Sequence, residues 1–117
     1  MNNREIGSAY ENKAVEYLKK HSYIIIEQNY FCKYGEIDII AKKKDMLVFV
    51  EVKYRKNSKT GIGENAVNRK KQMHIINSAQ NYMIEKYKTD EMLCRFDVIA
   101  INGNILHHIK NAFDGYY

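Results

Sequence analysis

The chain has 117 residues, of which 45% are hydrophobic and 28% are charged, and it contains no proline and no tryptophan. That length suits one domain with a single core, and this charged fraction is that of an ordinary globular protein, which excludes wholesale disorder. The formal net charge of +5 favours a partner that carries phosphates, because Lys and Arg side chains that neutralise phosphates release counterions.

The first half of the chain predicts one helix and three strands. Residues 4–20 carry apolar side chains at three-to-four spacing, which indicates an amphipathic helix. β-branched and aromatic residues then predict strands over residues 23–30, 36–41 and 46–54. The connections between these strands are short, a turn at Tyr34-Gly35 and a polar link over 42–45, so we expect an antiparallel meander.

The second half predicts one more helix and two more strands. A polar loop that contains glycine is expected over residues 55–63 and a helix over residues 64–86, with Val67 and Ile75 on its apolar side. Strands are expected over residues 95–101 and 105–109, joined by a tight turn. The predicted fold class is α/β, with a mixed sheet flanked by helices and the element order αβββαββ.

The third strand places two opposite charges among core residues. Alternation puts three valines on one face of residues 46–54 and Leu47, Phe49, Glu51 and Lys53 on the other. Both faces begin apolar, which is typical of a central strand that is covered on both sides. Buried charges cost several kcal/mol unless they are paired or bound to a metal, so Glu51 and Lys53 need a compensating partner.

Asp38 is a similar exception on the second strand, where we expect it to share a face with Glu36 and Ile40. Pairing of the second and third strands as a hairpin would bring Asp38 near the level of Glu51 or Lys53. Carboxylate oxygens of this kind suit Mg²⁺ or Mn²⁺, and the lysine could then steady developing negative charge on a phosphate. The alternative is a structural ion pair of Lys53 with one of the two acids.

An acidic residue on one strand and Glu-x-Lys on the next resembles the PD-(D/E)xK nuclease superfamily, which includes many restriction enzymes and archaeal Holliday-junction resolvases. Over nearly the whole chain the sequence also looks like the YraN family of small bacterial proteins assigned to that superfamily. The stretches that carry this resemblance are Gly7-x-x-x-Glu11-x-x-Ala14, Asn29-Tyr30, Gly35-Glu36-Ile37-Asp38-x-Ile40-Ala41, Phe49-Val50-Glu51-Val52-Lys53-x-Arg55, Gly61, Lys71, Arg95-Phe96-Asp97-Val98 and Asn111-Ala112-Phe113.

The resemblance implies a restriction-endonuclease-like fold and a role for each site residue. Asp38 and Glu51 would be metal ligands, Lys53 the catalytic lysine, and Glu11 a further acidic ligand from the first helix. Glu11 lies on the inward stripe of that helix, which agrees with this role. Ile37 stands where the superfamily pattern has proline, a departure that leaves the metal ligands in place.

Basic residues near the acidic motif are candidates for contacts with phosphate. Lys71 lies on the apolar stripe of the second helix and could reach the site, or it could simply extend its amine to water at the edge of the core. Arg55, Lys56 and Lys59 follow the third strand directly and would either hold the phosphate backbone or form a solvated loop.

The late polar residues are expected to be structural. Asp97 interrupts an apolar strand, and we expect it to pair with Arg95 or Arg55. His107 and His108 are adjacent on a strand and therefore face opposite sides, so they are not expected to bind one metal ion together.

These features predict a Mg²⁺- or Mn²⁺-dependent DNA endonuclease that hydrolyses phosphodiester bonds, with branched DNA suggested by analogy with resolvases alone. The alternatives are a non-catalytic nucleic-acid-binding or interaction module, and a structural adaptor in which the second helix forms a homodimer or partner surface. No apolar run approaches the ~18 residues of a membrane span, and no signal-type stretch follows Met1, so a cytoplasmic protein without membrane contact is expected.

Overall fold

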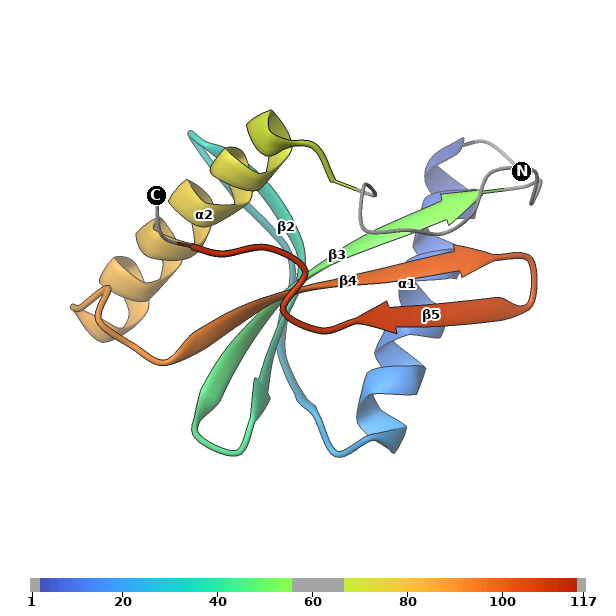
Figure 1. Ribbon diagram of the computed structural model, residues 1–117, viewed down its shortest axis with the longest axis horizontal. Helices are drawn as coiled ribbons and strands as arrows, with labels where there is room; N and C mark the ends of the chain where they lie inside the picture. Colours follow the sequence, from blue (N-terminus) through green and yellow to red (C-terminus); the bar gives the residue numbers. More distant parts are fainter. Residues whose placement is uncertain (1–2, 56–66, 116–117) are drawn as a thin grey trace.

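Figure 1 shows a computed structural model of the chain, which describes residues 3–55 and 67–115. The elements in chain order are α1 (Asn3–Lys20), β1 (Ile24–Cys32), β2 (Gly35–Lys43), β3 (Met46–Arg55), α2 (Arg69–Tyr87), β4 (Cys94–Asn102) and β5 (Ile105–Ile109). The predicted order αβββαββ and the mixed α/β class are therefore confirmed. Within the described ranges, neither helix combines the length and the apolar character needed to cross a membrane.

The strands form one mixed sheet in the order β1-β2-β3-β4-β5. β1, β2 and β3 are an antiparallel meander, as predicted, and β4 and β5 are an antiparallel hairpin. β3 and β4 run parallel, because the chain between them passes through α2 and returns to the end of the sheet at which β3 begins. This topology puts β3, which carries Glu51 and Lys53, in the middle of the sheet.

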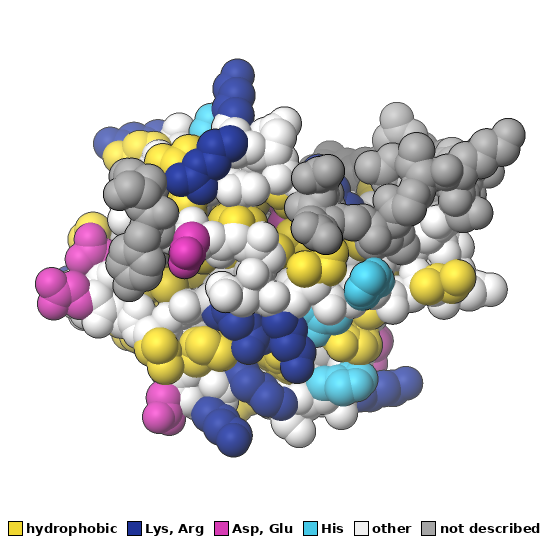
Figure 2. Space-filling view, viewed as in Figure 1, with side chains coloured by type: hydrophobic (Ala, Val, Ile, Leu, Met, Phe, Trp, Pro, Cys, Tyr) yellow, Lys and Arg dark blue, Asp and Glu magenta, His cyan; other side chains and the backbone are white. Residues whose placement is uncertain are grey.

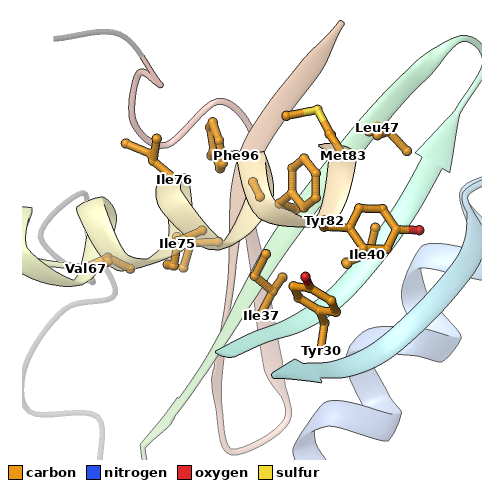
Figure 3. Close-up of a cluster of buried hydrophobic side chains, with 13 residues drawn as sticks. Tyr30, Ile37, Ile40, Leu47, Val67, Ile75, Ile76, Tyr82, Met83 and Phe96 are labelled. Atoms are coloured by element: carbon orange, nitrogen blue, oxygen red, sulfur yellow. The ribbon is translucent and has the colours of Figure 1, made fainter. Parts of the chain in front are cut away.

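The two helices cover opposite faces of the sheet (Figure 1). α1 packs Ala14, Val15 and Leu18 on one face, where valines of β3 meet it. On the other face, the apolar side of α2 packs against aromatic and branched residues of all four longer strands (Figure 3). Both faces of β3 are therefore buried, as the alternating pattern predicted.

The start of α2 differs from the prediction. The helix begins at Arg69 and not at residue 64, because Asn68 caps it: the Asn68 side chain accepts a hydrogen bond of 2.9 Å from the backbone N–H of Lys71. An asparagine in this position satisfies an N–H group that the helix itself leaves unpaired. Val67 is buried in the core beneath α2, yet it precedes the cap. Residues 64–66 lie outside the described part of the chain.

Candidate active site

The acidic site begins at an irregularity shared by β1 and β2. Tyr30 of β1 pairs with Ile37 of β2, so the preceding residue, Asn29, lies opposite Asp38. Asn29 has a φ of 55°, the left-handed region that asparagine tolerates better than most residues. β1 therefore departs from regular extended geometry opposite the first acidic residue.

This irregularity changes which face Asp38 occupies. Ile37 and Ile40 both belong to the core beneath α2, whereas Ile39 belongs to the core beneath α1. Regular alternation would put Ile37 and Ile40 on opposite faces, so the strand reverses its sides between them. The prediction that Asp38 shares a face with Ile40 was wrong, because Asp38 lines a cavity together with residues of α1, whereas Ile40 belongs to the core beneath α2.

Asp38 lies at a cavity of about 450 Å³ that opens on the α1 side of the sheet. Glu36 from β2 and Glu11 from α1 line the same cavity, together with Gly7, Ser8, Asn29, Phe31, Val52 and Tyr54. Glu11 accepts a hydrogen bond of 3.2 Å from the Gln28 side chain of β1. The structure thus brings the predicted helix acid to the cavity that Asp38 occupies.

The carboxyl groups of Asp38 on β2 and Glu51 on β3 interact with each other. The backbone N–H of Val52 donates to Asp38 Oδ2 at 2.8 Å, which fixes this carboxylate against β3. The side chain of Glu51 is 6% exposed, and its carboxyl group interacts with that of Asp38. Ionisation of Glu51 beside the Asp38 charge is costly, so Glu51 holds its proton more firmly than an exposed glutamate does.

Two lysines approach the buried member of this pair. Lys71 Nζ lies 3.5 Å and Lys53 Nζ lies 3.9 Å from Glu51 Oε2. Both lysine side chains remain about two-fifths exposed, at 41% for Lys71 and 42% for Lys53. Lys71, which lies on the apolar stripe of α2, therefore reaches the site. Both lysine side chains also retain contact with solvent.

The electrostatics of the site show an excess of negative charge. Burial, followed by the hydrogen bond and the charge of Asp38, raises the pKa of Glu51 to about 8, although Lys71 and Lys53 oppose this. Burial also raises the pKa of Glu11 and of Glu36, and the Asp38 charge adds to both shifts. Carboxyl groups with raised pKa values beside one another are poised to exchange a proton for a cation.

The donor set fits magnesium or manganese. Mg²⁺ is usually held by one or two carboxylates, with water and substrate phosphate completing its octahedron, and Asp38 and Glu51 supply that pair. Among the described residues, no three Asp, Glu, His or Cys side chains are grouped closely enough to hold one ion by themselves. Glu11 lines the cavity but does not form a three-residue group with Asp38 and Glu51, and its role as a ligand stays a prediction.

A second polar cluster lies on β4, and it confirms the structural role expected for Asp97. Arg95 Nε donates to Asp97 Oδ1 at 2.7 Å, and His108 Nε2 lies 2.7 Å from Asp97 Oδ2. Tyr17 from α1 hydrogen-bonds His108 Nδ1 at 3.0 Å. Burial alone would raise the pKa of Asp97, but hydrogen bonds from His108, Arg95 and the backbone N–H of Asn111 hold it below its ordinary value.

The contact of His108 with Asp97 was missed from the sequence, although the predicted hairpin contained its signal. Ile99 pairs with His108 across that hairpin, and residues two apart on one strand share a face. Asp97 is therefore a diagonal neighbour of His108. His107 is exposed on the opposite side, so the two histidines do face apart as predicted.

The predicted phosphate-binding loop lies largely outside the described residues. Lys56 and Lys59 belong to that segment, and for Arg55 the structure describes the backbone at the end of β3 but not the side chain. The role of this loop therefore stays a prediction.

Comparison with other proteins places the chain in a family. The model of "Uncharacterised protein family UPF0102" matches residues 10–101, a range that contains every predicted site residue. A UPF0102 protein of Fusobacterium nucleatum is 50% identical over 115 residues, which span 98% of this chain and 96% of that protein. The UPF0102 proteins of Lachnoclostridium phytofermentans and Caldicellulosiruptor saccharolyticus are 42% and 43% identical, over 99% and 97% of this chain and 98% and 100% of their own lengths. The chain therefore belongs to the UPF0102 family.

Proposed function

We propose that this protein is a Mg²⁺- or Mn²⁺-dependent DNA endonuclease of the PD-(D/E)xK superfamily, with a restriction-endonuclease-like fold. The observation that carries the proposal is the pair of interacting carboxyl groups, Asp38 on β2 and Glu51 on β3, with two lysine amines within 4 Å of the buried Glu51. The mixed sheet, with Asp38 on one strand and Glu51-x-Lys53 on the next, agrees with the pattern of that superfamily.

In this proposal, Asp38 and Glu51 would hold the cation, and Glu51 would give up its proton when the cation binds. The Val52 N–H keeps Asp38 oriented, so that little rearrangement is needed. Glu11 and Glu36 line the same cavity and can accept hydrogen bonds from water that enters it. A bound Mg²⁺ supplies positive charge for the scissile phosphate and lowers the pKa of an attacking water molecule.

The lysines would act on the phosphate. Hydrolysis adds the oxygen of a water molecule to phosphorus and breaks one P–O bond, and the leaving oxygen then takes up a proton. Lys53 is held by the central strand beside Glu51, where its amine can offset the negative charge that develops on the phosphate. Lys71 would hold the incoming phosphate from the first turn of α2.

A panel of DNA substrates tests this function. The purified protein is incubated with Mg²⁺ or Mn²⁺ and with linear duplex, single-stranded, flapped and four-way DNA, beside the Glu51→Ala and Lys53→Ala variants prepared in the same way. We expect the wild-type protein alone to cut, and the likeness to resolvases favours the branched substrates. Binding without cleavage across the whole panel would contradict the proposal and would favour the non-catalytic binding module.

A further inference from the structure

Exposed aromatic rings border the acidic cavity, and the proposed chemistry does not use them. Phe31 is the clearest case: its side chain is 73% exposed, it lies near the end of β1, and it lines the cavity. It pairs across the strands with Glu36, which lines the cavity too. A lone exposed apolar residue is ordinary on a protein surface, but a phenyl ring at the rim of an acidic cavity offers a contact of different chemistry.

A second ring lines the same cavity from β3. Tyr54 stacks on Tyr10 of α1 with ring centroids 4.7 Å apart and an interplanar angle of 9°. Gly7 lies against this ring, since a Cβ added at Gly7 would be 3.9 Å from Tyr54 Cε1. The Tyr54 ring is thus held by α1, so it does not need a ligand to fix its position.

Positive charge accompanies these rings. Lys33 follows Phe31 closely in the turn between β1 and β2, and its Nζ lies 5.2 Å from the centroid of the Tyr34 ring. This turn lies beside α2, because a Cβ added at Gly35 would be 3.6 Å from His74 Cβ. Lys and Arg side chains gather at the start of α2 (Figure 2), where the sequence reads Arg69-Lys70-Lys71. A ligand that combines phosphates with flat apolar groups would match both the charges and the rings.

We propose that Phe31 and Tyr54 receive an unpaired nucleobase of DNA next to the acidic pair, so that the site selects places where a duplex opens into single strand. This inference rests on the proposed function, and it names the substrate class of that site. An aromatic side chain can stack on the face of any base, which gives affinity without sequence preference. In a continuous duplex the faces of the bases are already stacked on each other, and only an unpaired base can reach the rim.

The experiment compares two DNA molecules that differ only in an unpaired segment. Fluorescence anisotropy measures the affinity for a blunt duplex and for the same duplex with a single-stranded flap, in EDTA and again in Mg²⁺, with the DNA checked afterwards for cleavage. The proteins are wild type, Phe31→Ala, Phe31→Trp and Ile24→Ala. Ile24 is the matched control, because it is 66% exposed at the opposite end of the same strand.

The expected result is a preference of about tenfold for the flapped DNA in the wild-type protein, the effect of one stacked base. Phe31→Ala should remove this preference, whereas Phe31→Trp and Ile24→Ala should keep it. Equal affinity of wild type for both DNAs, or an unchanged preference in Phe31→Ala, would overturn the proposal.

The cleavage assay separates this inference from the proposed function. A flap preference that depends on Phe31, without cleavage in Mg²⁺, would contradict the nuclease activity and support the binding role of the aromatic rim. Cleavage that requires Glu51 but is equally fast in wild type and Phe31→Ala on flapped DNA would contradict the binding role of the rim and support the nuclease activity.

Discussion

Lys71 Nζ lies 3.5 Å from Glu51 Oε2, closer than the 3.9 Å that separates this oxygen from Lys53. The backbone of Lys71 is also the donor of the hydrogen bond that caps α2 through Asn68. The first-turn residue whose N–H is satisfied by the cap is therefore also the one that brings a second positive charge to the buried carboxyl group. In this way the boundary of α2 shapes the electrostatics of the site.

The two lysines should have separable effects on DNA cleavage. Lys53→Ala should lower kcat about 100-fold, because it removes a charge aimed at the developing negative charge. Lys71→Ala should act mainly on KM, and Lys71→Arg should restore most of the loss, because the charge on phosphate is what matters. Steady-state kinetics on the preferred substrate measures both; a fall in kcat for Lys71→Ala as large as that for Lys53→Ala would contradict this division of roles.

The carboxyl pair should make the stability of the metal-free protein depend on pH. The pKa of Glu51 is about 8 in the folded protein against an ordinary value of 4.5, so its contribution is fully present below about pH 4.5 and is lost as the pH rises through about 8. This loss is at most about 1.4 kcal/mol per pH unit. Glu51→Gln should flatten that part of the profile, as urea unfolding in EDTA would measure.

Mg²⁺ should counteract this loss of stability in the wild-type protein, because the cation displaces the proton of Glu51. The rise in Tm on adding Mg²⁺ should therefore be larger at pH 8 than at pH 5, and it should be absent in Glu51→Gln. An equal rise in both proteins would show that the cation binds elsewhere.

The Asp97 cluster should stabilise the fold without contributing to cleavage. His108→Ala should cost about 1–3 kcal/mol, since it leaves a buried carboxylate short of a hydrogen bond. His107→Ala is the matched control. His107 is the neighbouring residue and its side chain is exposed, so this substitution should change the free energy of unfolding little. Chemical denaturation at neutral pH measures both; equal losses would mean that the His108 contact with Asp97 carries no stability.

The same cluster should set the acid limit of stability. The pKa of Asp97 lies below its ordinary value of 3.8 in the folded protein, so its contribution is present above about pH 3.8 and is lost as the pH falls through the folded value. Asp97→Asn should therefore unfold less steeply with acid than the wild-type protein, although it is less stable at neutral pH. A parallel acid transition in both proteins would place the acid sensitivity elsewhere.

Asn29 should matter through its backbone and through its side chain in different ways. Asn29→Gly keeps the left-handed φ accessible, whereas Asn29→Ala should cost about 1 kcal/mol more, because a Cβ disfavours this conformation. Both variants lose the amide side chain, which lowers the pKa of Glu11. A difference in stability between the two isolates the backbone effect, and a loss of cleavage common to both isolates the amide; equal stability would show that the reversal at Asp38 does not depend on φ at residue 29.

The sequence was sufficient to predict the central strand β3 and the approach of Asp38 on β2 to Glu51 on β3. Alternating valines predicted that β3 is covered on both faces, and the short link over 42–45 predicted the hairpin that brings Asp38 to Glu51. These features depend on local periodicity and on loop length, which a sequence displays directly.

Other features depended on contacts that periodicity does not encode. The apolar spacing of Val67 and Ile75 suggested one continuous helix, yet the cap at Asn68 begins it later. The side reversal near Asp38 lies opposite a left-handed residue of the neighbouring strand, and a pattern that assumes regular strands cannot show it. The approach of His108 to Asp97 needed the register of a hairpin in addition to its existence.

The nuclease assignment is tested by the rate of DNA cleavage in Mg²⁺ by the wild-type protein and by Glu51→Gln. Glutamine keeps the shape of the buried side chain but cannot give up a proton to a cation. Circular dichroism and urea unfolding first show that both proteins are folded. We expect cleavage by wild type that EDTA abolishes, and a loss of at least about 100-fold in Glu51→Gln. Equal cleavage by both proteins would show that the activity does not arise from this site, and no cleavage by wild type in either metal on any DNA of the panel would contradict the nuclease assignment itself.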